Sequence, residues 1–222
     1  SFHFPLVRAP RVLVIDHEGQ WIKELAIERS TDEWIAQFTS STDVMARQQA
    51  SGELARMHGD STTTAEGKQA IINAYHQVIR DLSTYWRVRY NAMAQLRWMM
   101  PQPFDANTIA VLKEAIVHEG SWNRAVAITL LGLSADPSLA ELYIAHLHDP
   151  SDRVVNAAAI ALGKSKSPLA YDALVKLKDK PSWKNQSLIS TLYALKELGD
   201  PRGAAIALDA IRDDPPGARW TL

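Results

Sequence analysis

The chain has 222 residues, 46% of them hydrophobic, so it can bury a sizeable core in one elongated domain or in a small piece plus a larger one. Its 24 lysines and arginines balance 25 aspartates and glutamates, which excludes a global positive charge for recruiting nucleic acid and an acidic tail. The absence of cysteine excludes disulfides, thiolate zinc sites and a cysteine nucleophile, and it leaves the compartment undefined.

Residues 1–29 carry the signals of β-strands. Residues 11–15 and 21–27 are rich in β-branched and aromatic side chains and flank a turn-like segment with Asp and Gly, which predicts a β-hairpin. A lone hairpin is only marginally stable in water, so its apolar side chains must pack on the helices or on a neighbouring sheet. The chain also begins with Ser1 instead of methionine and enters directly into this segment. We therefore expect a fragment of a longer protein.

From Ser30 onward the apolar residues recur at helical spacing. Ser30 and the segment Ser41-Thr42-Asp43 each precede such a run, as N-cap residues do, and predict two helix starts. Further helices are predicted over three segments that end at proline, glycine or polar residues: 65–82, 86–100 and 108–118. We therefore expect helical hairpins over residues 30–213 and a tail over residues 214–222. The longest apolar stretch is about half the length of a membrane-spanning helix, so no membrane partner is expected.

The last three predicted hairpins repeat one pattern: an alanine-rich helix that ends near a Leu-Gly or Gly-Leu pair, a turn with proline, and a second apolar helix. The prolines of the pattern follow one another at nearly equal spacing, and Ser-Trp pairs at Trp122 and Trp183 repeat as well. A period of about 30 residues is typical of solenoids, so the predicted fold class is all-α, an α-α superhelix. The residues that mark the repeats are Gly132 with Pro137, Gly163 with Pro168, and Gly199 with Pro201.

The sequence offers no complete catalytic or metal-binding motif. His17 and His118 each begin a His-Glu pair, but Trp21 and Trp122 occupy the positions of the second histidine of a helical zinc site. The looser group of histidines and aspartate in residues 146–149 fits the C-terminus of a helix better than a metal site. No nucleophile elbow or phosphate-binding loop is present. We therefore expect neither enzymatic activity nor a cofactor or metal in this chain.

Residues 85–90 interleave aromatic and basic side chains, as a peptide or nucleic-acid groove does. At helical spacing Trp86, Tyr90 and Met93 fall on one stripe, which is typical of a buried face, and basic and polar residues fall on another. A contact with a peptide or protein is the alternative to a solvated face, and we expect no nucleic-acid partner. The candidate contact residues are Arg87, Arg89 and Asn91.

Six lysines gather between residues 164 and 184. Asp172 and Asp179 lie among them and dilute their positive charge. We interpret this segment as a solvated surface formed by turns.

Residues 149–158, followed by Ala161-Leu162-Gly163 and Pro168, resemble a HEAT repeat. The consensus of that family has Asp-Pro, a Val-Arg pair, alanine-rich helix packing and Leu-Gly before proline. Asn156 stands where arginine is usual, which argues against the Asp–Arg ladder of the family at this position. The resemblance implies an armadillo-like array of hairpins that can act as an autonomous scaffold and bind a protein or peptide along its concave face. A kinship with HEAT-like bilin lyases is disfavoured, because no catalytic cluster is evident.

The front of the chain resembles the junction between the small β-sandwich and the C-terminal helical domain of aminopeptidase N-type zinc metallopeptidases. The matching segments are residues 4–6, 12–16, 19–23 and 43–47. This resemblance implies that residues 1–29 are a remnant of that sandwich. It also implies that the helices cap or gate the active-site chamber of a parent chain, with its zinc-containing catalytic domain as partner. The His-Glu-x-x-His and Gly-x-Met-x-Asn motifs of the family are absent, so no catalytic residue carries over.

Overall fold

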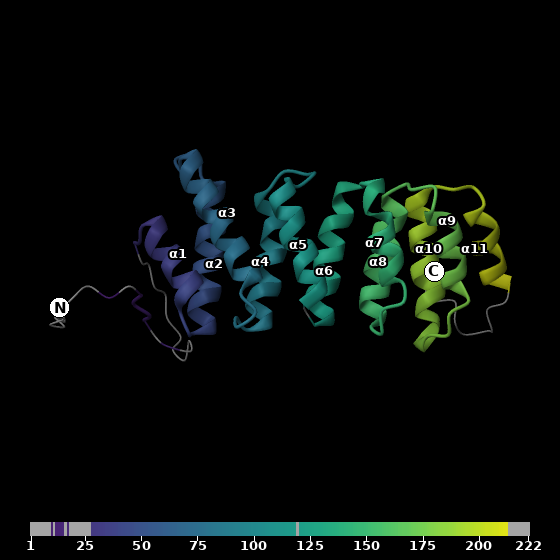
Figure 1. The fold of residues 1–222 in the computed structure, drawn as a ribbon, viewed down its shortest axis with the longest axis horizontal. Coiled ribbons are helices and arrows are strands. Elements are labelled where there is room, and N and C mark those ends of the chain that lie inside the picture. The colour runs from purple at the N-terminus through teal and green to yellow at the C-terminus, as the bar shows by residue number, and fades with distance from the viewer. Residues whose placement is uncertain (1–9, 11, 16, 18–27, 119, 213–222) are drawn as a thin grey trace. The chain divides into compact units, whose positions relative to one another are not determined.

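The computed structural model describes residues 10, 12–15, 17, 28–118 and 120–212, and its regular elements are helices (Figure 1). The predicted all-α class is therefore confirmed for this part of the chain. None of the helices in it is long and apolar enough to cross a membrane. The chain divides into two compact units, residues 1–100 and 101–222.

The predicted N-terminal β-hairpin is not seen. Residues 12–15 belong to its first run and form no strand, and residues 21–27, its second run, lie outside the described residues. A strand requires hydrogen bonds to a neighbouring strand, and a run of β-branched side chains does not by itself provide that partner. The predicted domain bounds at residues 1–29, 30–213 and 214–222 stay predictions, since most of the first segment and all of the last lie outside the described residues.

Within its described residues, the first unit contains two helical hairpins, α1 with α2 and α3 with α4. Their bounds are α1 (Thr31–Ser40), α2 (Val44–Gly59), α3 (Ala65–Arg80) and α4 (Trp86–Met99). Ser30 and Glu33 form a capping box at the start of α1, and the carboxylate of Asp43 accepts hydrogen bonds from two backbone amides at the start of α2. Both predicted helix starts are confirmed.

Large side chains fill the core of the first unit. The rings of Phe38 and Tyr75 pack with their centroids 4.8 Å apart. The Tyr75 hydroxyl donates a hydrogen bond of 2.6 Å to the Ser51 carbonyl, and burial raises the pKa of Tyr75 to about 12. Arg47 is also buried, and its Nε donates to the Phe38 carbonyl at 2.7 Å. The core therefore combines apolar packing with polar groups that bond to backbone carbonyls, although the buried Nη2 of Arg47 makes no hydrogen bond. Other fully buried members are Leu54, Ile71, Met93 and Leu96.

The second unit contains, in its described residues, three hairpins and a further helix. The hairpins are α5 (Ala106–His118) with α6 (Ser121–Leu131), α7 (Ala140–His146) with α8 (Asp152–Lys164), and α9 (Ala170–Lys178) with α10 (Gln186–Leu198), followed by α11 (Gly203–Arg212). The second helices α6, α8 and α10 pack on one another in succession. Short 3₁₀ segments lie at Gly132–Ser134, Pro137–Leu139 and Trp183–Asn185.

The turns of the second unit repeat in structure. A residue with left-handed backbone stands two positions before each marker proline. The residue directly before the proline accepts, through its side chain, a hydrogen bond from the backbone amide of the residue directly after the proline. The left-handed residues are Ala135 (φ 49°), Lys166 (φ 54°) and Gly199 (φ 72°). The accepting side chains belong to Asp136, Ser167 and Asp200. This shared geometry confirms the internal repeat and its spacing.

Glycine lets the second helices approach closely. A Cβ atom added to Gly132 would lie 2.7 Å from the Cβ of Ala161, and one added to Gly163 would lie 2.2 Å from the carbonyl oxygen of Ala194. Real Cβ atoms do not reach such distances, so both contacts, between α6 and α8 and between α8 and α10, require glycine.

Gly199 ends its helix, as the repeat pattern predicts, whereas Gly163 lies inside α8. Gly163 lies five residues before Pro168, in the contact between α8 and α10. Gly199 lies two residues before Pro201 and ends α10 in the left-handed conformation. The residue five positions before Pro201 is the exposed Lys196. Glycine therefore serves a helix contact in one repeat and a helix end in another, because both situations favour this residue type.

Polar contacts also join consecutive hairpins of the second unit. Arg124 on α6 donates from Nε and Nη2 to both carboxylate oxygens of Asp149, at 3.0 and 2.9 Å. One repeat later, Asn156 accepts a hydrogen bond of 3.0 Å from the Ser190 hydroxyl. An Asp–Arg contact is therefore present one repeat before Asn156, while a neutral hydrogen bond joins the helices at Asn156 itself.

Candidate functional site

Helices α6, α8 and α10 each leave one stripe of side chains accessible. The residues of these stripes occupy equivalent positions of the repeats, since Thr129, Ile160 and Tyr193 have the same spacing along the chain as the three marker prolines. Trp122 and Arg153 form a second equivalent pair, with the spacing of the first two prolines. We call the surface formed by Trp122, Thr129, Arg153, Ile160 and Tyr193 the α6–α8–α10 face.

Aromatic side chains are prominent on this face. Trp122 is 44% exposed and Tyr193 is 52% exposed. The guanidinium carbon of Arg153 lies 3.3 Å from the centre of the Trp122 ring, so the two side chains stack across the α6–α8 contact. Trp, Tyr and Arg are the residues most enriched among those that dominate protein–protein binding energies. The face therefore has the chemistry of a protein or peptide contact.

The residues named from the sequence lie on α4, and the structure separates them. Arg87 is exposed, with its guanidinium carbon 5.0 Å from the ring centre of Tyr90 and 5.8 Å from that of Trp86. Arg89 is only 7% exposed and its Nη1 donates to the Asp81 carbonyl at 3.2 Å. Asn91 is half-buried. The structure thus groups Arg87 with aromatic rings and places Arg89 inside, and a partner contact of the three stays a prediction.

The predicted buried stripe of α4 was partly wrong. Met93 is fully buried, but Trp86 is 37% exposed and Tyr90 is half-buried. A period of 3.6 residues allows two overlapping stripes, and the packing of α4 on α2 and α3 selects the one that excludes Trp86. The buried residues of α4 are Val88, Arg89, Ala92, Met93 and Leu96.

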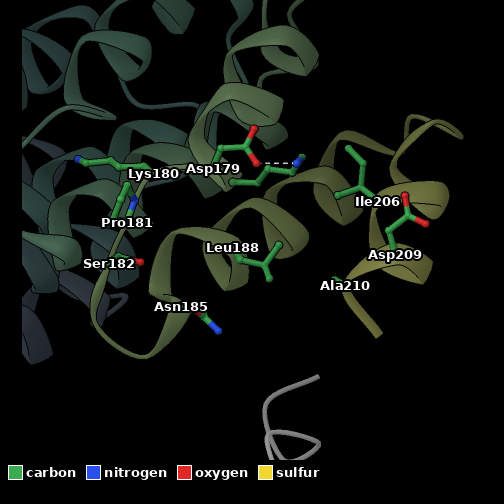
Figure 2. Close-up of a pocket in the computed structure, with 10 residues that line it drawn as sticks. Asp179, Lys180, Pro181, Ser182, Asn185, Leu188, Ile206, Asp209 and Ala210 are labelled. Atoms are coloured by element: carbon green, nitrogen blue, oxygen red, sulfur yellow. Dashed lines mark hydrogen bonds and ion pairs between the residues drawn. The ribbon is translucent and has the colours of Figure 1, made fainter. Parts of the chain in front are cut away.

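A cavity of about 540 Å³ lies between the end of α9, the start of α10 and α11 (Figure 2). Lys178 at its edge contacts the Asp179 carboxylate at 2.6 Å, and the Ser182 hydroxyl accepts a hydrogen bond of 2.8 Å from the Ser187 amide. The groups drawn in Figure 2 do not combine a nucleophile with a neighbouring base. Two aspartates of the repeat turns, Asp136 and Asp200, are structural: hydrogen bonds from the Ser138 amide and the Arg202 side chain hold their respective pKa values below the ordinary value.

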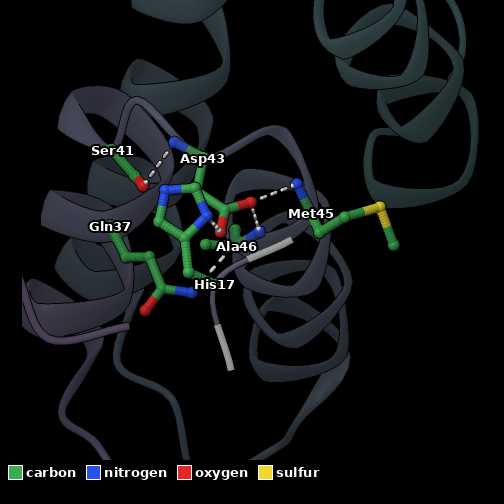
Figure 3. A network of polar contacts seen from close by, with 6 residues as sticks. All are labelled: His17, Gln37, Ser41, Asp43, Met45 and Ala46. Carbon is green, nitrogen blue, oxygen red and sulfur yellow. Dashed lines mark hydrogen bonds and ion pairs between the residues drawn. The ribbon is translucent and has the colours of Figure 1, made fainter. Parts of the chain in front are cut away.

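The histidines singled out in the sequence serve local contacts. His17 Nδ1 lies 3.3 Å from Oδ2 of the buried Asp43, whose other oxygen caps α2 (Figure 3). His118 is exposed at the end of α5, and His146 Nδ1 lies 2.8 Å from the Leu142 carbonyl oxygen one turn earlier. Among the described residues, no group of three or more His, Asp or Glu side chains could hold a metal ion.

Sequence reasoning missed the α6–α8–α10 face. The signal was available, because the offset that relates Pro137 to Pro168 also relates Trp122 to Arg153. Applying this offset to every position of the repeat, instead of to the prolines alone, would have revealed the stacked pair.

Residues 109–192 match the family model of HEAT repeats. No curated protein matches the chain. The matched span runs from α5 into α10 and contains most of the α6–α8–α10 face. The helical hairpins and this match confirm the prediction of a HEAT-like helical repeat domain. Neither finding links the chain to an aminopeptidase.

Proposed function

We propose that this chain is a non-catalytic HEAT-like scaffold that binds a protein or peptide along the α6–α8–α10 face. The observation that carries the proposal is the stack of Arg153 on Trp122, at equivalent positions of two consecutive hairpins, with the exposed Tyr193 on the second helix of the next hairpin. Arrays of helical hairpins present long continuous surfaces, and such surfaces suit extended partners. Tyr193 and Trp122 are the expected anchors, because large aromatic side chains bury much area at little cost in conformational entropy.

Peptide selection on the intact chain tests this proposal. Peptides are selected from a random library, and the affinity of the selected peptides is measured for the unmodified chain and for Trp122→Ser and Tyr193→Asp. We expect each substitution on the face to weaken binding at least about tenfold, as a central anchor does. Trp98→Ser is the matched control, since Trp98 is 78% exposed and lies in the first unit. Equal affinity in all variants would contradict the proposal.

A second candidate function is that of a C-terminal domain that caps or gates the chamber of an aminopeptidase-like parent. It rests on the resemblance of residues 4–47, and one contact supports it. His17, from the segment that resembles the preceding sandwich, touches Asp43 at the start of the helix that resembles the family's next element. In this proposal zinc and the catalytic residues belong to a preceding domain of the parent chain. That catalytic domain is the partner of the helices.

Aminoacyl fluorogenic substrates separate the two candidates. The capping role predicts peptidase activity and bound zinc in the longer gene product and neither in the 222-residue chain. A metal-free and inactive parent would contradict the capping role and leave the scaffold. Activity of the 222-residue chain itself would contradict both.

A further inference from the structure

A second surface of the same unit lies between the first helices of two hairpins. Helices α7 and α9 border a cavity of about 550 Å³, a volume within the range of specific binding sites. Its walls are mainly apolar and include Ile144, Leu147 and Leu177. Leu169 also lines it and is 50% exposed. We call this surface the α7–α9 groove.

The groove follows from the packing of the neighbouring helices. Gly163 brings α8 and α10 into a contact that leaves no room for a Cβ atom, whereas α7 and α9 touch only sparsely. Helix α7 has seven residues and α9 has nine, so neither can cover the other's apolar side along a long contact. Close approach of α8 and α10 therefore leaves Leu169 exposed and Ile144 half-buried between α7 and α9, while Leu147 and Leu177 are buried.

The charges along the groove are unevenly distributed. Lys180 Nζ donates to the Leu147 carbonyl at 3.3 Å, which places this lysine at the end of the groove where both helices finish. Lys176 lines the same end, and Asp172 lies one turn earlier on α9. Lys180 also borders the cavity of Figure 2, where the Asp179 carboxylate offsets the charge of Lys178 at 2.6 Å, so Lys176 and Lys180 carry the positive charge of the groove. Part of the lysine segment interpreted from the sequence as solvated turn surface thus forms the rim of an apolar groove.

We infer that the α7–α9 groove binds an acidic amphipathic segment of a partner protein. Leu169 occupies the N-cap position of α9, and Leu177 lies in the last turn of that helix. At the rise per residue of an α-helix the two positions are about 12 Å apart, so the groove matches about two turns of a bound helix. Apolar side chains spaced four and seven positions apart fill it, and carboxylates at one end of the segment meet Lys176 and Lys180. This site lies on α7 and α9 and is separate from the α6–α8–α10 face, so it does not depend on the function proposed above.

Binding of one designed peptide tests this site on the intact chain. The probe is a short fluorescein-labelled helical peptide with leucine at three positions of one face and two glutamates at its C-terminal end. We expect Leu169→Asp and Lys176→Glu to weaken its binding at least tenfold. Both side chains are exposed, so neither change should disturb folding, which circular dichroism verifies. A peptide with lysines in place of the two glutamates should bind Lys176→Glu better than the unmodified chain.

The matched control separates this site from the α6–α8–α10 face. Tyr193→Asp should leave probe binding unchanged. If Tyr193→Asp weakens the probe and Leu169→Asp does not, the inference is overturned and the function proposed above gains support. No detectable binding of the probe, or no effect of reversing the charge at Lys176, also overturns it. Self-association in sedimentation that Leu169→Asp abolishes would show that a second copy of the chain occupies the groove, contrary to the inference.

Discussion

The two units of this chain are both built from helical hairpins with large buried side chains, but among the described glycines those that close helix contacts require lie in the second unit. In the first unit, large residues such as Phe38 and Tyr75 fill the core, and buried polar groups such as Arg47 bond to backbone carbonyls. In the second unit, helices meet through Gly132 and Gly163 at distances that admit no Cβ atom. Both units therefore depend on the volume of buried side chains, and the second depends in addition on close approach.

This difference explains why the repeat is visible in one half of the sequence. A contact that requires glycine constrains the residue in the two repeats that make it, at Gly132 and Gly163, so the pattern survives there in the sequence. Large apolar side chains exchange with one another as long as the total volume is kept, and the pattern fades. The match to HEAT repeats accordingly falls on residues 109–192, in the second unit.

Replacement of Gly163 should have the largest effect on stability. In Gly163→Ala the new Cβ atom meets the carbonyl oxygen of Ala194, a backbone atom that cannot rotate away, so α8 and α10 must separate. We expect a loss of about 2–3 kcal/mol in the free energy of unfolding, measured by urea denaturation. An unchanged transition midpoint would show that the contact is not close.

Removal of the Tyr75 hydroxyl tests the polar core of the first unit. Tyr75→Phe loses the hydrogen bond to the Ser51 carbonyl and should cost about 1–1.5 kcal/mol at neutral pH. The pKa of Tyr75 is raised to about 12 from an ordinary 10.0, so the folded state holds this proton more tightly than the unfolded state. Its contribution is complete below pH 10 and is lost as the pH rises to 12. Urea midpoints from pH 9 to pH 12 should therefore fall more steeply for the unmodified chain than for Tyr75→Phe, and equal slopes would contradict this.

The Arg124–Asp149 contact should matter less than close packing in the second unit. Arg124→Gln removes two charge-assisted hydrogen bonds to a carboxylate whose side chain is only 8% exposed, and we expect a loss of about 1–2 kcal/mol. Arg56→Gln is the control, because Arg56 and Glu53 form an exposed pair that should contribute at most about 0.5 kcal/mol. Equal losses in both variants would show that the inter-repeat contact has no special value.

Gly52→Ala should have the smallest effect, with the opposite sign. Gly52 lies inside α2, and a Cβ atom added there meets nothing within 4 Å. The alanine should therefore stabilise the helix by about 0.5–1 kcal/mol, measured as a rise in the urea midpoint. A destabilised variant would mean that glycine is as constrained in the first unit as in the second.

Much of the helical framework was predictable, because N-caps and prolines act locally. Ser30, Asp43 and the spacing of Pro137, Pro168 and Pro201 located helix starts and turns. The close helix contact at Gly163 was not predictable, since one residue type serves both helix contacts and helix ends, and the sequence pattern does not distinguish them. The buried position of Arg89 was not predictable either, because it depends on which stripe of α4 packs on its neighbours.

The candidate sites depend on distances between helices that local patterns do not encode. Trp122 was recognised as a repeat marker, but its stacking with Arg153 requires α6 and α8 to lie side by side. The α7–α9 groove depends in the same way on the close contact between α8 and α10 that Gly163 allows.

Methyl NMR of isoleucine tests the central claim most directly. The chain is labelled at isoleucine methyl groups, and spectra are compared with and without a peptide selected on it. A partner on the α6–α8–α10 face should shift the Ile160 methyl signal most and leave that of Ile71, buried in the first unit, unchanged. An unchanged Ile160 signal under saturating peptide, with shifts confined to isoleucines of the first unit, would contradict the account.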